Sequence, residues 1–322
     1  MPNQRFPKVE ILHLQPHEIK FILSETDTSV ANALRRIMIA EVPTLTIDLV
    51  EFSENSTVLN DEYIAHRLGL IPIRYQPKES DKAIDCSDKF IPHRECICYE
   101  RCVNCSVEFE LDRTYTVTGD EEVLAPLTIT SKDLVSNNED VEPAHFLSPE
   151  EQDEAQDEGI AIVKMGPNQK LKLKAIARMG IAKEHAKWSP VAVATYRFWP
   201  EIHINHDEMA TLTTEQKQEL VDVCPDRILE LDEVTGEIRA VEDAWDIATY
   251  TEDLDFAQKA MKKRPEDDDF VTVRHSKDRF IFSVETTGAI DADELLLAAL
   301  KVLQKRLNDL ARELETIKEQ GN

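Results

Sequence analysis

The sequence predicts an α+β protein of about two domains, and three observations support this fold class. A chain of 322 residues is long enough to build two hydrophobic cores. Apolar and polar residues alternate over many short segments, as they do in half-buried strands, and only a few segments show helical spacing. The C-terminal residues instead carry a long leucine repeat, which predicts one extended helix.

The N-terminal segment predicts a hairpin followed by a helix. Residues 8–24 alternate in polarity on both sides of Gln15-Pro16-His17, which indicates two strands and a turn. Thr28 or Ser29 can cap the following helix, and Pro43 ends it. The apolar stripe of this helix consists of Val30, Ala33, Leu34, Ile37 and Met38.

Further strands surround a short second helix. Residues 44–55 read as a strand, and residues 70–75 resume extended structure. Between them, Asn60 can cap a helix that carries acids in its first turn and stops at Gly69. Another strand, residues 106–112, follows a cysteine-rich stretch that we therefore place in a loop or at a hairpin end.

The C-terminal part combines a strand with the long helix. Residues 278–286 predict the strand, and Asp291 with Glu294 forms an approximate capping box. The helix then runs from about Ala292 to Lys318. Its apolar positions alternate at four and three residues, the spacing of a heptad seam: Leu296, Leu300, Leu303, Leu307, Leu310, Leu314 and Ile317.

Charge and composition restrict the classes of function. A net charge of −26 repels phosphate backbones, which disfavours duplex binding and favours basic protein partners. The sequence has no apolar run of the roughly 20 residues that a membrane span requires, and its first ten residues lack the apolar region of a secretion signal. Nine acids crowd residues 139–158, so we expect a solvated loop over 137–158. The polar segment 205–269 has no assigned role.

Four of the six cysteines fall within ten positions: Cys96, Cys98, Cys102 and Cys105. In the reducing compartment that we expect, such a cluster indicates metal or redox chemistry rather than disulfides. The C-x-C and C-x2-C turns let four thiolates converge on one zinc ion, which would hold this one loop together. An iron–sulfur site fits the spacing less well, and a redox pair less still. Cys86 and Cys224 stand apart and are interpreted as plain, partly buried residues.

The sequence offers no catalytic constellation, so we expect no activity of the chain's own. A closed site of four thiolates has no open position for a reactive water. Pro16 prevents His13 and His17 from sharing a helix face, and His203 and His206 have no cysteine nearby. The eight glycines form no phosphate-binding loop.

Seven cations lie between Lys164 and Lys187, around the alternating stretch KLKLKAIAR at residues 170–178. The alternation places its apolar residues on one face of a strand and its cations on the other. Two interpretations stay open: a solvated strand face, or a cationic patch that docks an acidic partner. Two pairs near helix ends, Arg35-Arg36 and His66-Arg67, could also reach across an interface.

These segments in combination closely resemble the α-like third-largest subunit of eukaryotic RNA polymerase II. The most specific are TSVANALRRIMIAEVPTLTID, LNDEYIAHRLGLIPI and MGIAKEHAKWSP. The four-cysteine loop and the final FIFSVETTGAI with its long helix are similar to the same family. That family is related to the bacterial polymerase α N-terminal domain and the archaeal D subunit, and the resemblance covers roughly residues 5–200 and 270–315.

The resemblance implies a discontinuous dimerisation domain, with halves at residues 1–48 and 271–322. It encloses an inserted, mainly β domain at 49–200, with the zinc loop at 96–105, and a variable acidic segment at 201–270. The long helix is expected to pack on the related helix of a smaller α-like subunit, the polymerase's eleventh, as a heterodimer. The implied dimer interface comprises Leu34, Ile37, Met38, Leu300, Leu303, Leu307, Leu310 and Leu314.

The function that the resemblance implies is that of a non-catalytic scaffold for mRNA transcription in the nucleus. The heterodimer would anchor the second-largest, catalytic subunit and small zinc-bearing subunits, and it would meet nucleic acid only through the complex. No membrane role is expected. Carried over by motif, the candidate subunit contacts are Arg35, Arg36, His66, Arg67, Lys183, Glu184, His185, Lys187 and Trp188.

Three alternatives remain at this point. The first is a related nuclear subunit, from polymerases I and III or from a plant-type derivative of polymerase II. By resemblance, the I and III subunit lacks this zinc loop. The second is a free zinc-stabilised adaptor that binds nucleic acid, which the negative charge opposes. The third, an autonomous enzyme, is opposed by the missing catalytic constellation.

Overall fold

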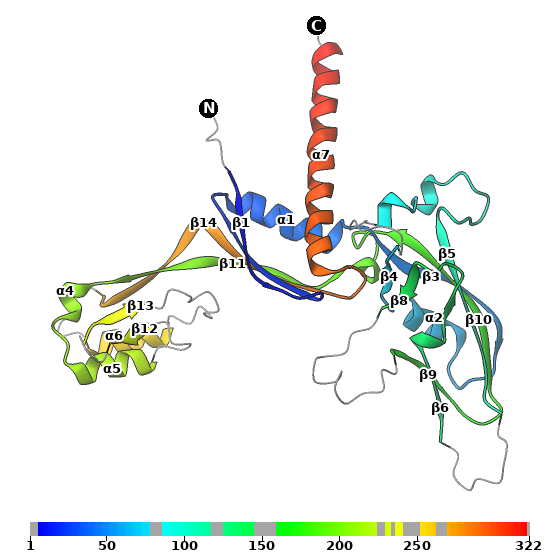
Figure 1. Ribbon diagram of the computed structural model, residues 1–322, viewed down its shortest axis with the longest axis horizontal. Helices are drawn as coiled ribbons and strands as arrows, with labels where there is room; N and C mark the ends of the chain where they lie inside the picture. The colour runs from blue at the N-terminus through cyan, green and yellow to red at the C-terminus, as the bar shows by residue number, and fades with distance from the viewer. Residues whose placement is uncertain are drawn as a thin grey trace. The chain divides into compact units, whose positions relative to one another are not determined.

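The computed structural model in Figure 1 combines sheets and helices and ends in one long helix, which confirms the predicted α+β class. The structure describes residues 6–77, 86–116, 125–144, 159–223, 229–232, 236–240, 252–261 and 269–320. Cys224 and most of the predicted acidic loop lie outside these residues. No helix in the described ranges is long and apolar enough to cross a membrane.

A four-stranded sheet joins strands from distant parts of the sequence. Its order is β1-β2-β14-β11, with β1 at Lys8–Leu14, β2 at Glu18–Ser24, β14 at Val271–Thr286 and β11 at Val191–Ile204. The predicted N-terminal hairpin is therefore confirmed. Inside this sheet the rings of Phe21 and Phe282 stack with centroids 4.8 Å apart.

A six-stranded sheet forms the larger core. Its order is β7-β5-β10-β3-β4-β8. The strands are β7 (Val135–Ser136), β5 (Ser106–Thr114), β10 (Lys170–Gly180), β3 (Thr44–Asn55), β4 (Ile73–Tyr75) and β8 (Val141–Pro143). A separate two-stranded sheet pairs β6 (Leu127–Thr130) with β9 (Ala161–Met165), and short 3-10 turns lie at Cys86–Asp88, His93–Glu95, Ser131–Asp133 and Ala186–Trp188.

The centre of the six-stranded sheet is β10, which pairs antiparallel with both β3 and β5. Its alternation is as predicted, because Leu171, Leu173, Ala175 and Ala177 are all buried. Ile176 is buried as well, although it belongs to the opposite face by parity. The register shift between Ile176 and Ala177 skips Asp48, so the extra residue lies on β3 and the alternation of β10 itself continues past Ile176.

Two helices precede the cysteine loop. Helix α1 spans Thr28–Ala40, and its cap is Asp27, whose Oδ1 accepts from the backbone N–H of Val30 at 3.0 Å. The predicted caps Thr28 and Ser29 are therefore wrong, and Val30, predicted in the apolar stripe, is 39% exposed. Helix α2, Asp61–Gly69, is capped by Asn60 as predicted, through the N–H of Tyr63.

The segment between β11 and β14 builds a small core of its own. It contains α4 (His206–Met209), α5 (Thr214–Val223), a β12–β13 hairpin (Leu229–Leu231 and Ile238–Ala240) and α6 (Glu252–Met261). Leu220, Leu229 and Ile238 are buried together, so a charged segment still buries a set of apolar side chains.

The long helix α7 spans Ala292–Gln320. The predicted capping box forms only in part. The Glu294 carboxylate accepts from the backbone N–H of Asp291, whereas the Asp291 carboxylate turns to Arg74, with Nη2 and Oδ2 2.6 Å apart. Gly288, before the helix, has φ +95°, a left-handed conformation that glycine adopts without strain.

Contacts divide the chain into two compact units, each discontinuous in sequence. One contains residues 1–10, 21–31 and 196–282, and the other contains 11–20, 32–195 and 283–322. The second unit holds the six-stranded sheet, the cysteine loop and α7. The domain limits implied by the resemblance, 1–48, 49–200, 201–270 and 271–322, stay a prediction.

Candidate metal centre and interface helix

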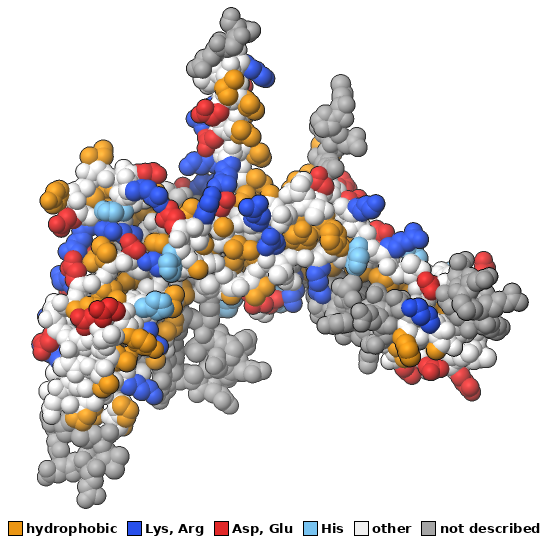
Figure 2. Space-filling view, turned by 180° about the vertical axis from the view of Figure 1, so that it is seen from behind, with side chains coloured by type: hydrophobic (Ala, Val, Ile, Leu, Met, Phe, Trp, Pro, Cys, Tyr) orange, Lys and Arg blue, Asp and Glu red, His pale blue; other side chains and the backbone are white. Residues whose placement is uncertain are grey.

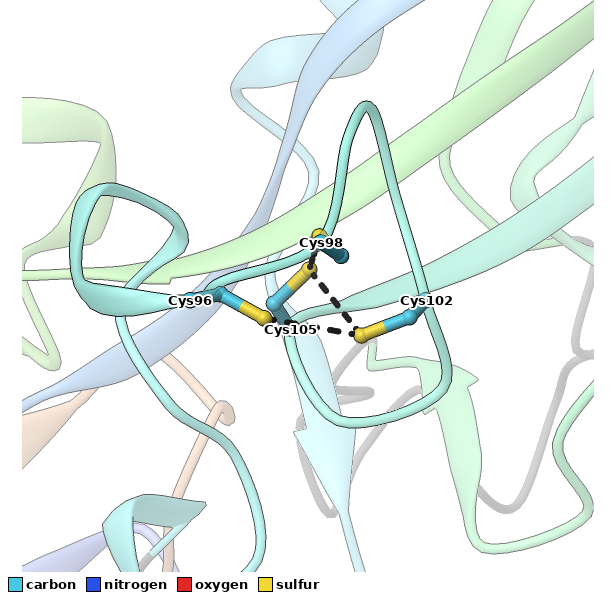
Figure 3. Close-up of side chains that lie close together, drawn as sticks. All are labelled: Cys96, Cys98, Cys102 and Cys105. Carbon is cyan, nitrogen blue, oxygen red and sulfur yellow. Dashed lines mark hydrogen bonds between the residues drawn. The ribbon is translucent and has the colours of Figure 1, made fainter.

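The four clustered cysteines converge in the loop before β5, and Figure 3 shows their sulfur atoms turned toward one another. All four Sγ atoms lie within 4.8 Å of one another. Sγ–Sγ distances are 3.6 Å for Cys96–Cys102 and Cys98–Cys105, and 3.7 Å for Cys102–Cys105. Four thiolates about 2.3 Å from one tetrahedral ion would lie about 3.8 Å apart, so this cluster could hold a metal ion.

The thiols differ in acidity before any ion binds. The backbone N–H of Asn104 is the main cause that lowers the pKa of Cys102 to about 7, because it stabilises the thiolate. Hydrogen bonding with Cys96 is the main cause that raises the pKa of Cys98 to about 12. A cation must therefore displace protons from the cluster, and its affinity should rise with pH.

Arg101 attaches the cysteine loop to the six-stranded sheet. Its guanidinium lies between two carboxylates on neighbouring elements, 2.8 Å from Glu51 of β3 and 2.9 Å from Glu108 of β5. Both carboxylates raise its pKa, the hydrogen bond to Glu51 most strongly. Arg178 of β10 adds a bond to the carbonyl of Glu100 at 3.4 Å. No local sequence pattern indicates this attachment, since it depends on which strands are neighbours.

Cys86 lies apart from the cluster. Cys86 is buried, as interpreted from the sequence, and its Sγ lies 3.1 Å from the carbonyl of Pro43. Cys224 is outside the described residues. One histidine does approach the cluster, since His93 Nδ1 lies 3.9 Å from the sulfur of Cys105. No local sequence pattern indicates this position, because His93 belongs to neither of the two histidine pairs.

The basic stretch on β10 is largely neutralised by its neighbours. Lys170 lies 2.8 Å from Glu54, Lys172 lies 2.6 Å from Asp112, and Lys174 lies 2.9 Å from Glu110. Each carboxylate belongs to β3 or β5, the two strands that flank β10. The structure therefore supports the solvated strand face over a free cationic patch.

The second half of α7 exposes its leucine seam. Leu307 and Leu310 are each 58% exposed and Leu314 is 50% exposed, although each belongs to the predicted heptad repeat. In Figure 2 orange apolar side chains follow one side of the upper part of α7, and charged side chains follow the other. The apolar residues that α7 buries are near its start, at Ala292, Leu295, Ala298 and Ala299. The seam is thus left available to another chain.

The first three residues of the implied dimer interface behave differently. Leu34, Ile37 and Met38 are all at most 5% exposed, because the chain's own interior takes them up. They offer no free surface in this structure. Leu300 is 43% exposed and Leu303 is half-buried, so the accessible part of the implied interface lies on α7.

The candidate contacts on the first two helices divide into exposed and engaged side chains. Arg36 and His66 are exposed. Arg35 bonds to Asn32 of its own helix at 2.9 Å. Arg67 donates to the carbonyls of Ala161 and Ile162 at 2.6 and 2.9 Å, so its guanidinium links α2 to β9.

The Lys183–Trp188 run is similarly divided. Lys183 is exposed, Glu184 pairs with Arg94, and the His185 ring accepts from the backbone N–H of Lys187. Lys187 lies 2.7 Å from Asp48 and over the indole of its neighbour. Trp188 is buried, and its Nε1 donates to the carbonyl of Arg178 at 3.1 Å. Within this run the exposed side chains are the ones that remain available to a partner.

Comparison with known families decides what this arrangement belongs to. The family described as the RNA polymerase Rpb3/Rpb11 dimerisation domain matches residues 20–307. This range contains the cysteine cluster and the leucine seam as far as Leu307. The chain belongs to this family. The resemblance drawn from sequence motifs is therefore confirmed.

Individual Rpb3/Rpb11 relatives match over nearly the whole chain. It is 42% identical to the Arabidopsis thaliana protein named DNA-directed RNA polymerases II, IV and V subunit 3, covering 98% of this chain and 93% of that protein. It is 41% identical to the Dictyostelium discoideum RNA polymerase II subunit rpb3, over 95% of this chain and 94% of the relative. The Dictyostelium subunit rpac1 of polymerases I and III is 28% identical, over 94% of this chain and 80% of the relative.

Proposed function

We propose that the chain is the α-like, third-largest subunit of an RNA polymerase II-type enzyme in the nucleus. It acts as an assembly platform and performs no nucleotidyl transfer by itself. The observation that carries this proposal is the exposed leucine seam of α7 in a chain that belongs to a dimerisation family. An isolated soluble protein gains nothing from leaving several leucines of one helix face in water.

The partner of that seam is the smaller α-like subunit, the polymerase's eleventh, in a heterodimer. Burying Leu307, Leu310 and Leu314 at about 1.5–3 kcal/mol each supplies enough driving force for a stable helix–helix contact. The dimer then anchors the second-largest, catalytic subunit and small zinc-bearing subunits. Among the candidate contacts, the exposed Arg36, His66 and Lys183 are best placed for these roles.

The metal of the cysteine cluster is zinc, bound as one structural ion by Cys96, Cys98, Cys102 and Cys105. Four soft thiolates at tetrahedral spacing suit zinc, which prefers such sites and has no redox chemistry there. Bound zinc would hold the loop closed. The role of this chain's own residues is to present the four sulfur atoms and to attach the loop to the sheet through Arg101.

The assignment to a polymerase II-type enzyme rests on a contrast within one organism. The chain is 41% identical to the Dictyostelium polymerase II subunit but 28% identical to the I and III subunit. Relatives named for polymerases IV and V are as similar to this chain as the Dictyostelium polymerase II subunit is. A subunit of a plant-type derivative of polymerase II is therefore the second candidate.

The test is affinity purification of the tagged chain from its own cells, followed by identification of the co-purifying proteins. We expect the two largest subunits of one polymerase II-type enzyme and a smaller α-like subunit. Recovery of the chain alone would contradict the platform role. Recovery of polymerase I or III subunits would transfer the same role to those enzymes. The isolated chain should synthesise no RNA.

A further inference from the structure

Helix α7 is held on its charged side by ion pairs rather than by close packing. A groove of about 1010 Å³ lies beside the helix, between it and residues 87–95, the segment that leads into the cysteine loop. Phe90 and Ile91 line this groove on the loop side, and Val302 and Lys305 line it on the helix side. Apolar contacts therefore fix only the first turns of α7, and its direction beyond them depends on charged contacts.

The first such contact joins α7 to the end of α1. Arg306 Nη1 lies 2.8 Å from Glu41 Oε1, and the Glu41 side chain is only 15% exposed. Glu41 directly follows the C-terminus of α1, where the helix dipole disfavours an anion. Its other oxygen, Oε2, is buried with no hydrogen-bond partner in the described part of the chain. A carboxylate in this position requires a cation, and Arg306 is the one that reaches it.

Two more contacts lie nearer the start of the helix. Lys301 Nζ binds both carboxylate oxygens of Asp88, at 2.7 and 2.9 Å, in the turn that precedes the cysteine loop. Arg74 of β4 binds Asp291 at 2.6 Å, with both side chains less than a quarter exposed. The three pairs thus connect α7, or Asp291 directly before it, to three separate places: the end of α1, the turn at 86–88, and β4.

We propose that Arg306–Glu41, Lys301–Asp88 and Arg74–Asp291 form an electrostatic latch that sets the direction of α7 before a partner binds. The latch residues are positioning residues: they act on the leucine seam by orienting the helix that carries it. Lys301 lies on a different face of α7 from Leu303, Leu307 and Leu310, by their spacing. Arg306 lies three residues after Leu303 and four before Leu310, so it borders the seam, and its ion pair with Glu41 directs its guanidinium to the end of α1.

The physical basis is pre-organisation. A helix that can pivot presents its seam correctly for only part of the time, and the apparent affinity for a partner falls by that fraction. Single ion pairs at exposed positions contribute little, but three that restrain one rigid helix act together. This inference rests on the proposed heterodimer for its binding readout, whereas the restraint on α7 can be measured without a partner.

The experiment uses the full chain and a matched pair of variants, Arg306→Ala and Lys305→Ala. Both remove one cation from the same turn, but Lys305 has no ion-pair partner among the described residues. The partner-free readout is the distribution of distances between a spin label at Glu313 of α7 and one at Val135 of β7, both exposed positions, because a helix that pivots as a rigid body keeps its own hydrogen bonds. We expect a broader distribution in Arg306→Ala than in Lys305→Ala, and equal widths would overturn the latch.

The second readout is titration with the purified smaller α-like subunit. We expect Arg306→Ala to bind about three- to tenfold more weakly than the wild type, and Lys305→Ala to bind within about twofold. Adding Glu41→Gln to Arg306→Ala should recover part of the loss, because the buried charge is then removed. Likewise Lys301→Asp should be rescued by Asp88→Lys. A loss without either rescue would mean that these residues act through direct contact with the partner or through general stability, against the proposal.

The two proposals fail in different ways. A wild-type chain that does not bind the smaller subunit contradicts the heterodimer, and the distance measurement still decides the latch. A wild-type chain that binds, with Arg306→Ala binding equally well, contradicts the positioning role alone.

Discussion

The indole ring of Trp188 lies directly on the backbone of Gly180. A Cβ atom added to Gly180 would fall 2.5 Å from Trp188 Cε2 and 2.7 Å from Cδ2. The ring is buried and anchored by its own hydrogen bond to Arg178, so it has little freedom to move away. This close contact explains why Trp188 is buried although it ends the basic segment 183–188.

Replacing Gly180 by alanine should therefore destabilise the six-stranded unit. We expect Gly180→Ala to lower the free energy of unfolding by about 1–3 kcal/mol, the usual cost of overpacking a closed site. Gly166→Ala is the control, because its added Cβ would meet nothing closer than 3.7 Å. Chemical denaturation of both variants checks this, and equal midpoints would contradict the close packing.

Metal content tests the cysteine cluster. We expect one zinc per chain by elemental analysis, and less than half of that in Cys105→Ser, because a closed site of three thiolates binds zinc poorly. Cys86→Ser is the matched control and should keep the full content. Iron in place of zinc, or a full zinc content in Cys105→Ser, would refute the proposed ligand set.

Arg101 should affect zinc affinity without touching the ion. Arg101→Ala frees the loop from Glu51 and Glu108, so the four sulfur atoms must be ordered when zinc binds. We expect about three- to tenfold weaker zinc binding in competition with a chelator. Arg113→Ala removes another arginine of the same sheet, one paired with Asp133, and should leave zinc affinity unchanged. Equal affinities in the two variants would show that the anchor is dispensable.

Glu294, at the start of α7, should give a pH dependence of stability. Burial is the main cause that raises its pKa above the ordinary 4.5, followed by repulsion from Asp291 and Asp293, with Arg74 opposing. The folded state therefore binds the proton more tightly than the unfolded state, and stability from this group falls as pH rises through the folded pKa.

Glu294→Gln has no carboxyl group to ionise, so it avoids the loss of stability that accompanies ionisation of Glu294. We expect the variant to be more stable than the wild type at pH 7 by less than about 1 kcal/mol. The difference from the wild type should shrink as pH falls toward 4.5. Thermal unfolding at several pH values measures this. A destabilised variant at pH 7 would mean that its bond to the Asp291 N–H outweighs the burial of charge.

Local patterns in the sequence predicted much of the fold, because they depend on residues close in the chain. Alternation located β10, the Asn60 cap located α2, and the heptad spacing located α7. The cysteine spacing likewise predicted the converging thiols, since all four lie in one loop. The cap of α1 was misjudged because three adjacent polar residues can all fill that position, and geometry selects Asp27.

What escaped prediction depends on strand neighbours that are distant in sequence. The lysines of β10 looked like a free cationic patch until β3 and β5 placed a carboxylate opposite each of them. Arg67 looked available for a partner, yet it binds carbonyls of β9. Leu34 and Met38 looked like interface residues, although a helix stripe can face the chain's own core equally well.

The most direct test of the platform role is the leucine seam itself. Leu307→Asp with Leu310→Asp places two charges on the exposed seam, and Gln304→Asp with Asn308→Asp places two charges on the same turns away from it. Each tagged variant is co-expressed with the smaller α-like subunit, and the native mass of the purified product is measured. We expect a heterodimer for the wild type and the control and a lone chain for the leucine variant. A heterodimer with the leucine variant would contradict the account.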